Sequence, residues 1–275
     1  MAGILYIVAT PIGNLSDISK RAVEVLDSCS VILCEDTRHS GKLFAHLGLK
    51  KKLLSLHDHN EEERIPQIVS LLKSGESIAL ISDAGTPGIA DPGYRVIRSA
   101  IDSGFAVSPV PGPVAFVNAL VASGLPTDSF FFGGFLPSKK NERRKRLEEL
   151  RTIPGTLVFY ETPHRINAAL LDCLEVLGNR NGAIAREMTK LHEEFIRGTL
   201  TEIAALLAER EVKGEMVLLI DRAGEGDALE TTTTVADLVK EFEAVGNDSK
   251  SALKLAAKKL GISKSEAYRR LQMEK

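Results

Sequence analysis

ISDAGTPGIADPG, residues 81–93, is the most informative stretch of this chain. It follows a short apolar run, 77–81, of the kind that forms a buried parallel strand. Its three glycines permit positive φ and close approach to a ligand, while its two prolines fix its course. Ligands of open α/β sheets bind outside the carboxyl ends of the strands, so a backbone-rich binding loop is predicted here. Asp83 and Asp91 are expected to accept hydrogen bonds from neighbouring amides, with Asp91 as a helix N-cap and Pro92 as the first helical residue.

Strand-like and helix-like segments alternate on both sides of this loop. From residue 4 to residue 110 the alternation is regular, which predicts an α/β domain with a mostly parallel sheet. Pro111-Gly112-Pro113 interrupts the pattern, and the order of elements beyond it predicts a second α/β domain with a mixed sheet. We therefore expect a two-domain α/β fold, with residues 1–112 and 113–223 as its domains, 224–234 as a polar linker and 235–275 as a helical tail.

The tail contains two short predicted helices around Gly261-Ile262-Ser263, an arrangement similar to a helix-turn-helix. The alternative is a helical appendage that packs on a partner subunit. Basic charge is concentrated there: residues 249–275 carry eight Lys or Arg against two acids, and residues 136–146 carry six against one, although the whole chain has a net charge of −2. Two basic clusters are typical of a protein with a polyanionic partner. Solvated helix faces are the alternative explanation for either cluster.

Several function classes lose their usual support. The chain has no GxGxxG after its first strand, no Walker lysine loop, no GxSxG and no HExxH, which removes the common signals for NAD, ATP, serine hydrolases and zincins. His57-Asp58-His59 lacks further suitably spaced ligands, so no metal site is predicted. Three cysteines without a CxxC pair are expected to be reduced thiols. The absence of a long apolar span and of a basic leader predicts a cytoplasmic protein without a membrane partner.

Six ordered motifs carry a family resemblance that extends over nearly the whole chain. They are VATPIGNLSD near the start, SDAGTPGIADPG, VPGPVA at 110–115, FYETPHR at 159–165, AREMTKLHEEF at 185–195 and GEMVLLI at 214–220. The set closely resembles the ribosomal RNA small-subunit methyltransferase I group of the tetrapyrrole methylase superfamily, whose members use S-adenosylmethionine (SAM). Many tetrapyrrole methylases have a GDP triplet where this chain has Gly85-Thr86-Pro87, a difference that favours the RNA-modifying branch.

The resemblance implies a two-domain tetrapyrrole-methylase-like fold, a homodimer and a SAM site in the cleft between the domains. It implies transfer of a methyl group to the ribose 2′-hydroxyl of a cytidine in 16S ribosomal RNA of the small subunit. Motif matching places the cofactor-binding positions at Ile12, Asp83, Ala84, Gly85, Thr86, Ile89, Val114, Ala115 and Tyr160.

Transfer to a ribose hydroxyl needs alignment of the reacting atoms and a group that accepts the proton or stabilises the alkoxide. The stretch 186–194 is the richest in such groups. Lys190 is expected to lower the pKa of the hydroxyl, or to act as the base if burial depresses its own pKa. Glu187 and Glu193 are the alternative proton acceptors, and a salt-bridged hairpin edge without a catalytic role is the competing explanation.

Contacts to RNA phosphates are expected from both basic clusters and from two arginines near the site. The predicted residues are Lys139, Lys140, Arg143, Arg144, Arg165, Arg186, Lys258 and Arg269. Two other functions remain open. One is a SAM-dependent methylase of tetrapyrrole or cobalamin precursors, which are also polyanions. The other is an RNA-binding assembly factor that keeps the fold without catalysis.

Overall fold

The computed structural model describes residues 2–210, 212–224, 235–259 and 262–273. Two compact units are distinguished, residues 1–222 and 223–275, and each is considered by itself. Residues 225–234 of the predicted linker and Gly261 of the predicted turn lie outside the described residues.

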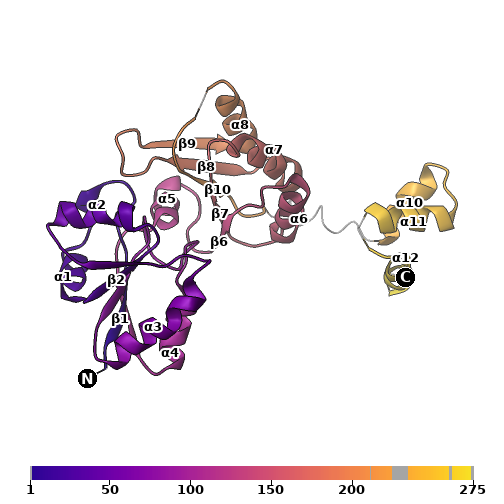
Figure 1. Cartoon of the computed structure of the whole chain (residues 1–275). Helices are drawn as coiled ribbons and strands as arrows, with labels where there is room; N and C mark the ends of the chain where they lie inside the picture. The colour runs from indigo at the N-terminus through magenta and orange to yellow at the C-terminus, as the bar shows by residue number, and fades with distance from the viewer. Residues whose placement is uncertain (1, 211, 225–234, 260–261, 274–275) are drawn as a thin grey trace. The chain divides into compact units, whose positions relative to one another are not determined.

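The first sheet of unit 1 is entirely parallel (Figure 1). Its strands lie in the order β3-β2-β4-β1-β5. They are β1 (Ile4–Val8), β2 (Val31–Cys34), β3 (Lys52–Ser55), β4 (Ile78–Leu80) and β5 (Ala106–Val110). Helices cover both faces, which explains why β2 and β4 are continuous apolar runs instead of alternating ones.

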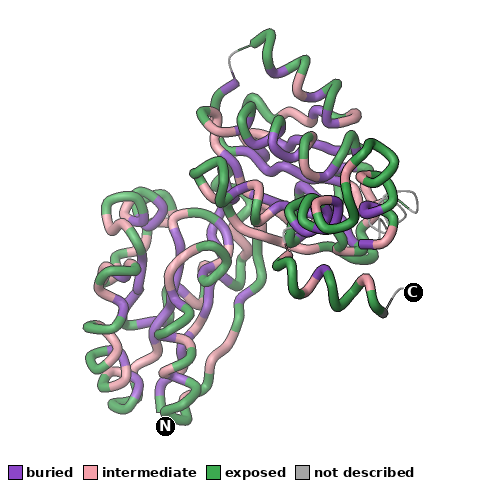
Figure 2. The backbone as a smooth tube through the Cα atoms, turned by 90° about the vertical axis from the view of Figure 1, so that its right-hand side faces the viewer, coloured by how far each residue is buried: buried purple, intermediate pink, exposed green. Residues whose placement is uncertain are grey.

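Each face of this sheet has its own apolar cluster, and Figure 2 shows the strands between the helices as buried, in purple. On one face, α1 (Lys20–Ser28) and α2 (Thr37–Leu47) contribute Leu26 and Phe44. On the other face, α3 (Glu61–Lys73) and α4 (Tyr94–Asp102) contribute Leu72 and Val96. A short 3₁₀ turn, η1 (Leu15–Asp17), precedes α1.

The second sheet is mixed, as the sequence predicts. Its order is β6-β7-β10-β8-β9, with β6 parallel to β7 and all other neighbours antiparallel. The strands are β6 (Phe130–Phe135), β7 (Thr156–Glu161), β8 (Asn181–Arg186), β9 (Glu194–Thr199) and β10 (Met216–Ile220). A parallel sheet followed by a mixed sheet is the order that the sequence predicts.

Helices also cover both faces of the second sheet. On one face, α6 (Lys140–Leu150), α7 (Ile166–Leu177) and α8 (Leu200–Ala208) share a large apolar cluster. On the other face, α5 (Ala115–Ser123) packs on β7, β8 and β10. Ile12, from the loop after β1, belongs to this second cluster. The two sheets therefore meet in one compact unit, although the chain crosses from one to the other only at the Pro111-Gly112-Pro113 turn.

Unit 2 is a three-helix cluster with its own core. Its helices are α10 (Val235–Ala244), α11 (Ser249–Lys259) and α12 (Lys264–Met273). Val235, Leu238, Leu253 and Ala267 are among the buried residues that hold them together. Among the described residues, no helix combines the length and apolarity that a membrane span requires.

Candidate active site

Two neighbouring strands of the first sheet, β1 and β4, continue into connections that leave in opposite directions across the sheet. The connection after β1 leads to β2 on one side, and the connection after β4 leads to β5 on the other, so β1 and β4 flank a topological switch point. The two loops are joined by reciprocal backbone bonds: Thr10 N donates to Gly85 O (2.8 Å) and Gly85 N donates to Thr10 O (3.1 Å). These two hydrogen bonds hold the loop 83–93 against the first loop of the chain.

The glycines of the loop 83–93 adopt the conformations that its sequence predicts. Gly85, Gly88 and Gly93 have φ of 84°, 79° and 132°. Ala90 also has a positive φ, 61°, which costs a residue with a Cβ about 1 kcal/mol or more. Backbone strain of this kind is concentrated at functional sites in proteins.

The predicted N-cap is wrong. Helix α4 begins at Tyr94 with Gly93 as its cap residue, so neither Asp91 nor Pro92 has the expected helical position. The positive φ of Gly93 turns the chain only after Pro92, which leaves the Asp91 carboxyl free to line a cavity. Asp83 accepts a hydrogen bond from the amide of Asp36 (3.3 Å), which comes from the neighbouring strand end and not from its own loop.

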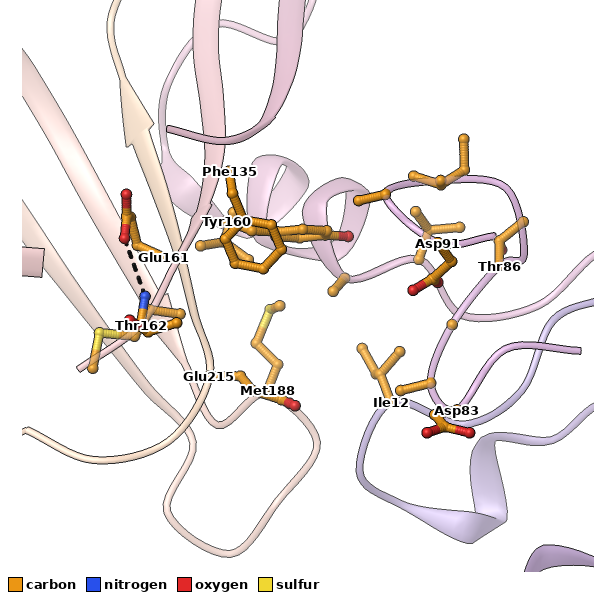
Figure 3. Close-up of a pocket in the computed structure, with 18 residues that line it drawn as sticks. Ile12, Asp83, Thr86, Asp91, Phe135, Tyr160, Glu161, Thr162, Met188 and Glu215 are labelled. Carbon is orange, nitrogen blue, oxygen red and sulfur yellow. Dashed lines mark hydrogen bonds between the residues drawn. The ribbon is translucent and has the colours of Figure 1, made fainter. Parts of the chain in front are cut away.

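A cavity of about 280 Å³ lies between the ends of the two sheets. All nine residues predicted to bind the cofactor line it: Ile12, Asp83, Ala84, Gly85, Thr86, Ile89, Val114, Ala115 and Tyr160. Figure 3 shows Ile12, Asp83, Thr86 and Asp91 on one side and Tyr160 and Phe135 on the other. Its volume is close to the lower end of the range for small-molecule sites, roughly 300 to 1,000 Å³.

Nine further described residues line the cavity, of which Glu161 adjoins the predicted Tyr160 in the motif FYETPHR. They are Ala90, Asp91, Phe135, Glu161, Thr162, Met188, Glu215, Met216 and Val217. The strand-end rule that finds the loop 83–93 also applies to β6 and β7, because these parallel strands both end at the cavity. Phe135 could have been found in this way, and the motif GEMVLLI already contained the three residues from β10 and its approach.

The polar lining of the cavity is acidic. Asp83, Asp91, Glu161 and Glu215 are among the lining residues, whereas no described lysine, arginine or histidine is. Glu161 accepts a hydrogen bond from the Thr162 amide (3.2 Å; Figure 3) and lies 3.3 Å from the Arg165 guanidinium. Burial raises the pKa of Glu161, an effect that Arg165 opposes.

Asp91 has the most perturbed carboxyl of the cavity. Burial, and after it the nearby Glu35 carboxyl, raise the pKa of Asp91 to about 6. A hydrogen bond with Ser82 opposes this shift, and Asp83 and Asp58 add smaller upward contributions. Neither Asp83 nor Asp91 forms a salt bridge with any other residue that the structure describes. A largely apolar cavity with a few polar groups and a perturbed carboxyl is the usual mark of a functional site.

The predicted catalytic residues lie on the β8–β9 hairpin, beside the cavity. The Lys190 ammonium contacts Glu187 (2.9 Å) and Glu215 (3.2 Å), and the Glu193 carboxylate accepts a hydrogen bond from the Thr189 amide (2.6 Å). Burial lowers the pKa of Lys190, but the hydrogen bonds to the two glutamates outweigh it and the net shift is upward. The condition on which Lys190 was expected to act as a base, a pKa depressed by burial, is therefore not met, and the raised pKa favours the cationic form.

The hairpin is strained and held against the first loop of the chain. Glu187 and Thr189 have positive φ values of 48° and 65°. Gly13 approaches so closely that an added Cβ would lie 2.6 Å from Lys190 Cγ and 3.0 Å from the Met188 carbonyl oxygen. Met188 is the residue of this turn that lines the cavity. The structure therefore brings the predicted cofactor residues and the hairpin together, with the hairpin's charged side chains at the cavity's edge.

The basic residues near α6 are less available than their sequence suggests. Arg143 is 5% exposed and its guanidinium lies 2.6 Å from the buried Asp172 carboxylate, which does not fit a phosphate contact. Arg144 pairs with Asp172 (2.7 Å) and with Glu175. Lys139 pairs with Glu142 (3.1 Å), whereas Lys140 is exposed. The local positive charge of this segment is largely neutralised by acids of α6 and α7.

Arg165 and Arg186 are also engaged within the fold. Arg165 donates to the Leu136 carbonyl and to Glu161. Arg186 donates to Glu194 (2.7 Å) and to the Lys213 carbonyl (2.9 Å). Both are partly exposed, so a phosphate contact at either requires exchange of an existing partner.

The basic residues of unit 2 are more available. Lys258 is exposed, and it shares one face of α11 with the equally exposed Lys250 and Lys254 at intervals of four residues. None of the three pairs with a described acid. Arg269 pairs with Glu266 (2.5 Å) but remains 68% exposed. Unit 2 thus presents a stripe of lysines suited to a polyanion.

Comparison with known families agrees with this geometry. The model of the Tetrapyrrole (Corrin/Porphyrin) Methylases matches residues 4–204. The chain belongs to this family. A protein of Halalkalibacterium halodurans named ribosomal RNA small subunit methyltransferase I is 46% identical over 97% of this chain and 93% of its own length. A relative of the same name from Vibrio cholerae is 47% identical over 98% of this chain and 94% of its own.

Solved structures of methyltransferases share the fold at lower identity. The methyltransferase CobJ matches with a TM-score of 0.61 and 16% identity, covering 81% of this chain and 95% of that structure. Uroporphyrin-III-C-methyltransferase from Thermus thermophilus matches with a TM-score of 0.55 and 21% identity, covering 80% and 95%. The family resemblance inferred from the six motifs is confirmed, including its RNA-methyltransferase group, whose name the close relatives carry.

Proposed function

We propose that this tetrapyrrole methylase is a SAM-dependent methyltransferase that modifies the ribose 2′-hydroxyl of a cytidine in 16S ribosomal RNA. The observation that carries the proposal is the cavity, which collects all nine predicted cofactor positions and is acidic without a cationic side chain among its described lining residues. The names of the close relatives support a small-subunit ribosomal RNA substrate, and with it a place of action in the cytoplasm.

The lining residues fit SAM by their chemistry. A phosphate-bearing cofactor would require donors or cations, whereas SAM carries a sulfonium and an ammonium that carboxylates and carbonyl oxygens attract. When bound, SAM supplies an activated methyl group. Asp83 and Asp91 are suited to its positive groups, and Ile12, Ile89 and Val114 offer apolar contact.

The hairpin residues are proposed to handle the proton of the acceptor. The protonated Lys190, fixed by Glu187 and Glu215, favours a developing alkoxide near the cavity edge and so lowers the pKa of the hydroxyl. Glu187 and Glu193 are the proposed proton acceptors. The hydrogen bond from Lys190 lowers the pKa of Glu187 and so weakens this carboxylate as a base in the resting state.

RNA is proposed to contact unit 2 and the exposed lysines near α6. The lysine stripe of α11 supplies cations that no described acid neutralises, and Lys140 adds one in unit 1. A small substrate does not require such a separate basic unit. The homodimer implied by the family resemblance remains part of the proposal, and light scattering of the purified chain tests it.

The test is methyl transfer from methyl-labelled SAM to three substrates offered side by side. They are purified small ribosomal subunits, naked 16S ribosomal RNA and a precorrin-type tetrapyrrole. The proposal expects label in RNA only. Label in the tetrapyrrole alone would contradict it and favour a role like that in the name of the Thermus thermophilus structure. SAM binding with no label in any substrate would favour the assembly-factor alternative.

A further inference from the structure

The carboxylates of the cavity are not equally neutralised. Arg165 lies beside Glu161, and Lys190 lies beside Glu215. Asp83 and Asp91, on the opposite side of the cavity in Figure 3, have no described cationic partner. When both are ionised, the cavity keeps an excess of negative charge on the side formed by the loop 83–93.

The groups around Asp91 reinforce this charge instead of cancelling it. Glu35 follows β2, Asp58 follows β3 and Asp83 belongs to the same loop. The pKa of Glu35 is itself raised, first by burial and then by Asp83 and Asp58, with His57 opposing. Across the cavity, Asp91 raises the pKa of the Tyr160 hydroxyl in addition to the larger effect of burial. The Arg38 guanidinium, at the start of α2, pairs with Asp36 (2.8 Å).

SAM and its product differ by one methyl group and one positive charge. The sulfonium of SAM becomes an uncharged thioether in S-adenosylhomocysteine, while the adenosine and amino acid groups are unchanged. A carboxylate in a partly desolvated cavity therefore distinguishes the two ligands electrostatically, by an amount that depends on whether it is ionised. Common contacts cancel in the ratio of the two affinities.

We propose that the Asp91 carboxyl makes this cavity selective for the sulfonium form of the cofactor over the uncharged thioether product, and that protonation of Asp91 removes this selectivity. The inference rests on the proposed SAM-dependent function and names a specificity residue of that same site. Loss of the sulfonium charge weakens the electrostatic attraction between Asp91 and the product. Asp91 therefore favours replacement of S-adenosylhomocysteine by SAM.

The same coupling has a reciprocal effect on the proton. A cation that prefers ionised Asp91 must lower the pKa of that carboxyl, because linkage is symmetric. Near pH 6, where the free carboxyl is partly protonated, SAM binding should therefore release a fraction of a proton. S-adenosylhomocysteine should release less.

The test is calorimetric binding of SAM and of S-adenosylhomocysteine to the full chain between pH 5 and pH 8, without RNA. The ratio of product to SAM dissociation constants is expected to fall roughly fivefold from pH 8 to pH 5, the size of one screened charge interaction. Asp91→Asn should lower the ratio by a similar factor at pH 8 and remove its pH dependence. Titrations near pH 6 in buffers of different ionisation enthalpy should show proton release on SAM binding that Asp91→Asn abolishes.

Asp102→Asn is the matched control, since Asp102 is an acid of α4 that pairs with Arg98 and does not line the cavity. It should behave as the unmodified chain. A ratio that is independent of pH, or unchanged in Asp91→Asn, overturns the inference while SAM binding itself leaves the proposed function standing. Failure of the unmodified chain to bind SAM overturns the proposed function. If Asp91→Asn does not fold, the pH series and the proton release of the unmodified chain decide the matter alone.

Discussion

Removal of the Asp172 carboxylate should destabilise unit 1 strongly without changing the cavity. Asp172 lies on α7, its side chain is 3% exposed, and it accepts hydrogen bonds from Arg143 Nε (2.8 Å) and Arg144 Nε (2.7 Å). Arg143 is equally inaccessible, with a side chain that is 6% exposed. Asp172→Ala leaves this guanidinium buried with only the carbonyl oxygens of Pro137 and Ser138 as partners.

The expected loss follows from the burial of the pair. Breaking a buried ion pair by removal of one partner costs about 3 to 5 kcal/mol, because an uncompensated charge remains. We therefore expect Asp172→Ala to lower the free energy of unfolding by about 4 kcal/mol in urea denaturation. Asp102→Ala is the matched control: its pair with Arg98 is exposed, so its loss should stay below about 1 kcal/mol.

The pH dependence has a definite sign. Burial raises the pKa of Asp172, but the hydrogen bonds from Arg144 and Arg143 outweigh this, and the folded-state pKa lies below its usual value. The stabilisation is therefore present above the unfolded pKa of about 3.9 and is lost as pH falls through the folded value. The difference between the unmodified chain and Asp172→Ala should narrow below about pH 4. A difference under about 1 kcal/mol at pH 7 would refute the structural role assigned to Arg143.

Two further predictions concern function. Lys190→Met should leave SAM affinity within about twofold, measured by calorimetry, but lower the methyl-transfer rate by roughly a hundredfold or more, because the cation beside Glu187 and Glu215 is lost; an unchanged rate would reduce Lys190 to a structural ion pair. Replacement of the three lysines of the α11 stripe, Lys250, Lys254 and Lys258, by glutamine should weaken RNA binding in a filter assay. The slope of log affinity against log salt concentration should become shallower by about 3. Lys259→Gln removes a lysine that is already paired with Glu241 and should change this slope little. A slope unchanged in the triple variant would favour the alternative that the tail packs on a partner subunit.

Local sequence predicts the elements well because their signals lie within a few residues. Hydrophobic patterns and turn residues predict helices over 37–47, 61–73 and 166–177 and strands over 130–135 and 156–161. Helices α2, α3 and α7 and strands β6 and β7 have these bounds. Helix α2, for example, begins after the Asp36 cap and ends at Gly48, which adopts the left-handed conformation with φ of 69°. The strand-end rule likewise predicted that the loop 83–93 binds a ligand, and five of the nine predicted cofactor positions line the cavity from this loop.

The properties that the sequence does not predict are set by residues distant in the chain. Arg143 belongs to a basic run, yet it is buried and its guanidinium pairs with Asp172, 29 residues away. The pKa of Asp91 depends on Glu35 and Asp58, which reach it only through the sheet order β3-β2-β4. Lys190 is held as a cation by Glu215, from the approach to β10. Such pairings follow from the tertiary fold, so a one-dimensional charge count cannot supply them.

The most direct test of the proposed function measures whether methylation of the RNA depends on the cavity. Methyl-labelled SAM is incubated with small ribosomal subunits and either the unmodified chain or Ala84→Trp, whose large side chain would enter the cavity from an exposed position of the loop 83–93. The account predicts label at one cytidine ribose, seen as resistance to alkaline cleavage, and loss of that label with Ala84→Trp although RNA binding persists. Label that survives in the cavity-blocked variant, or that maps to a base instead of a ribose, would contradict the account.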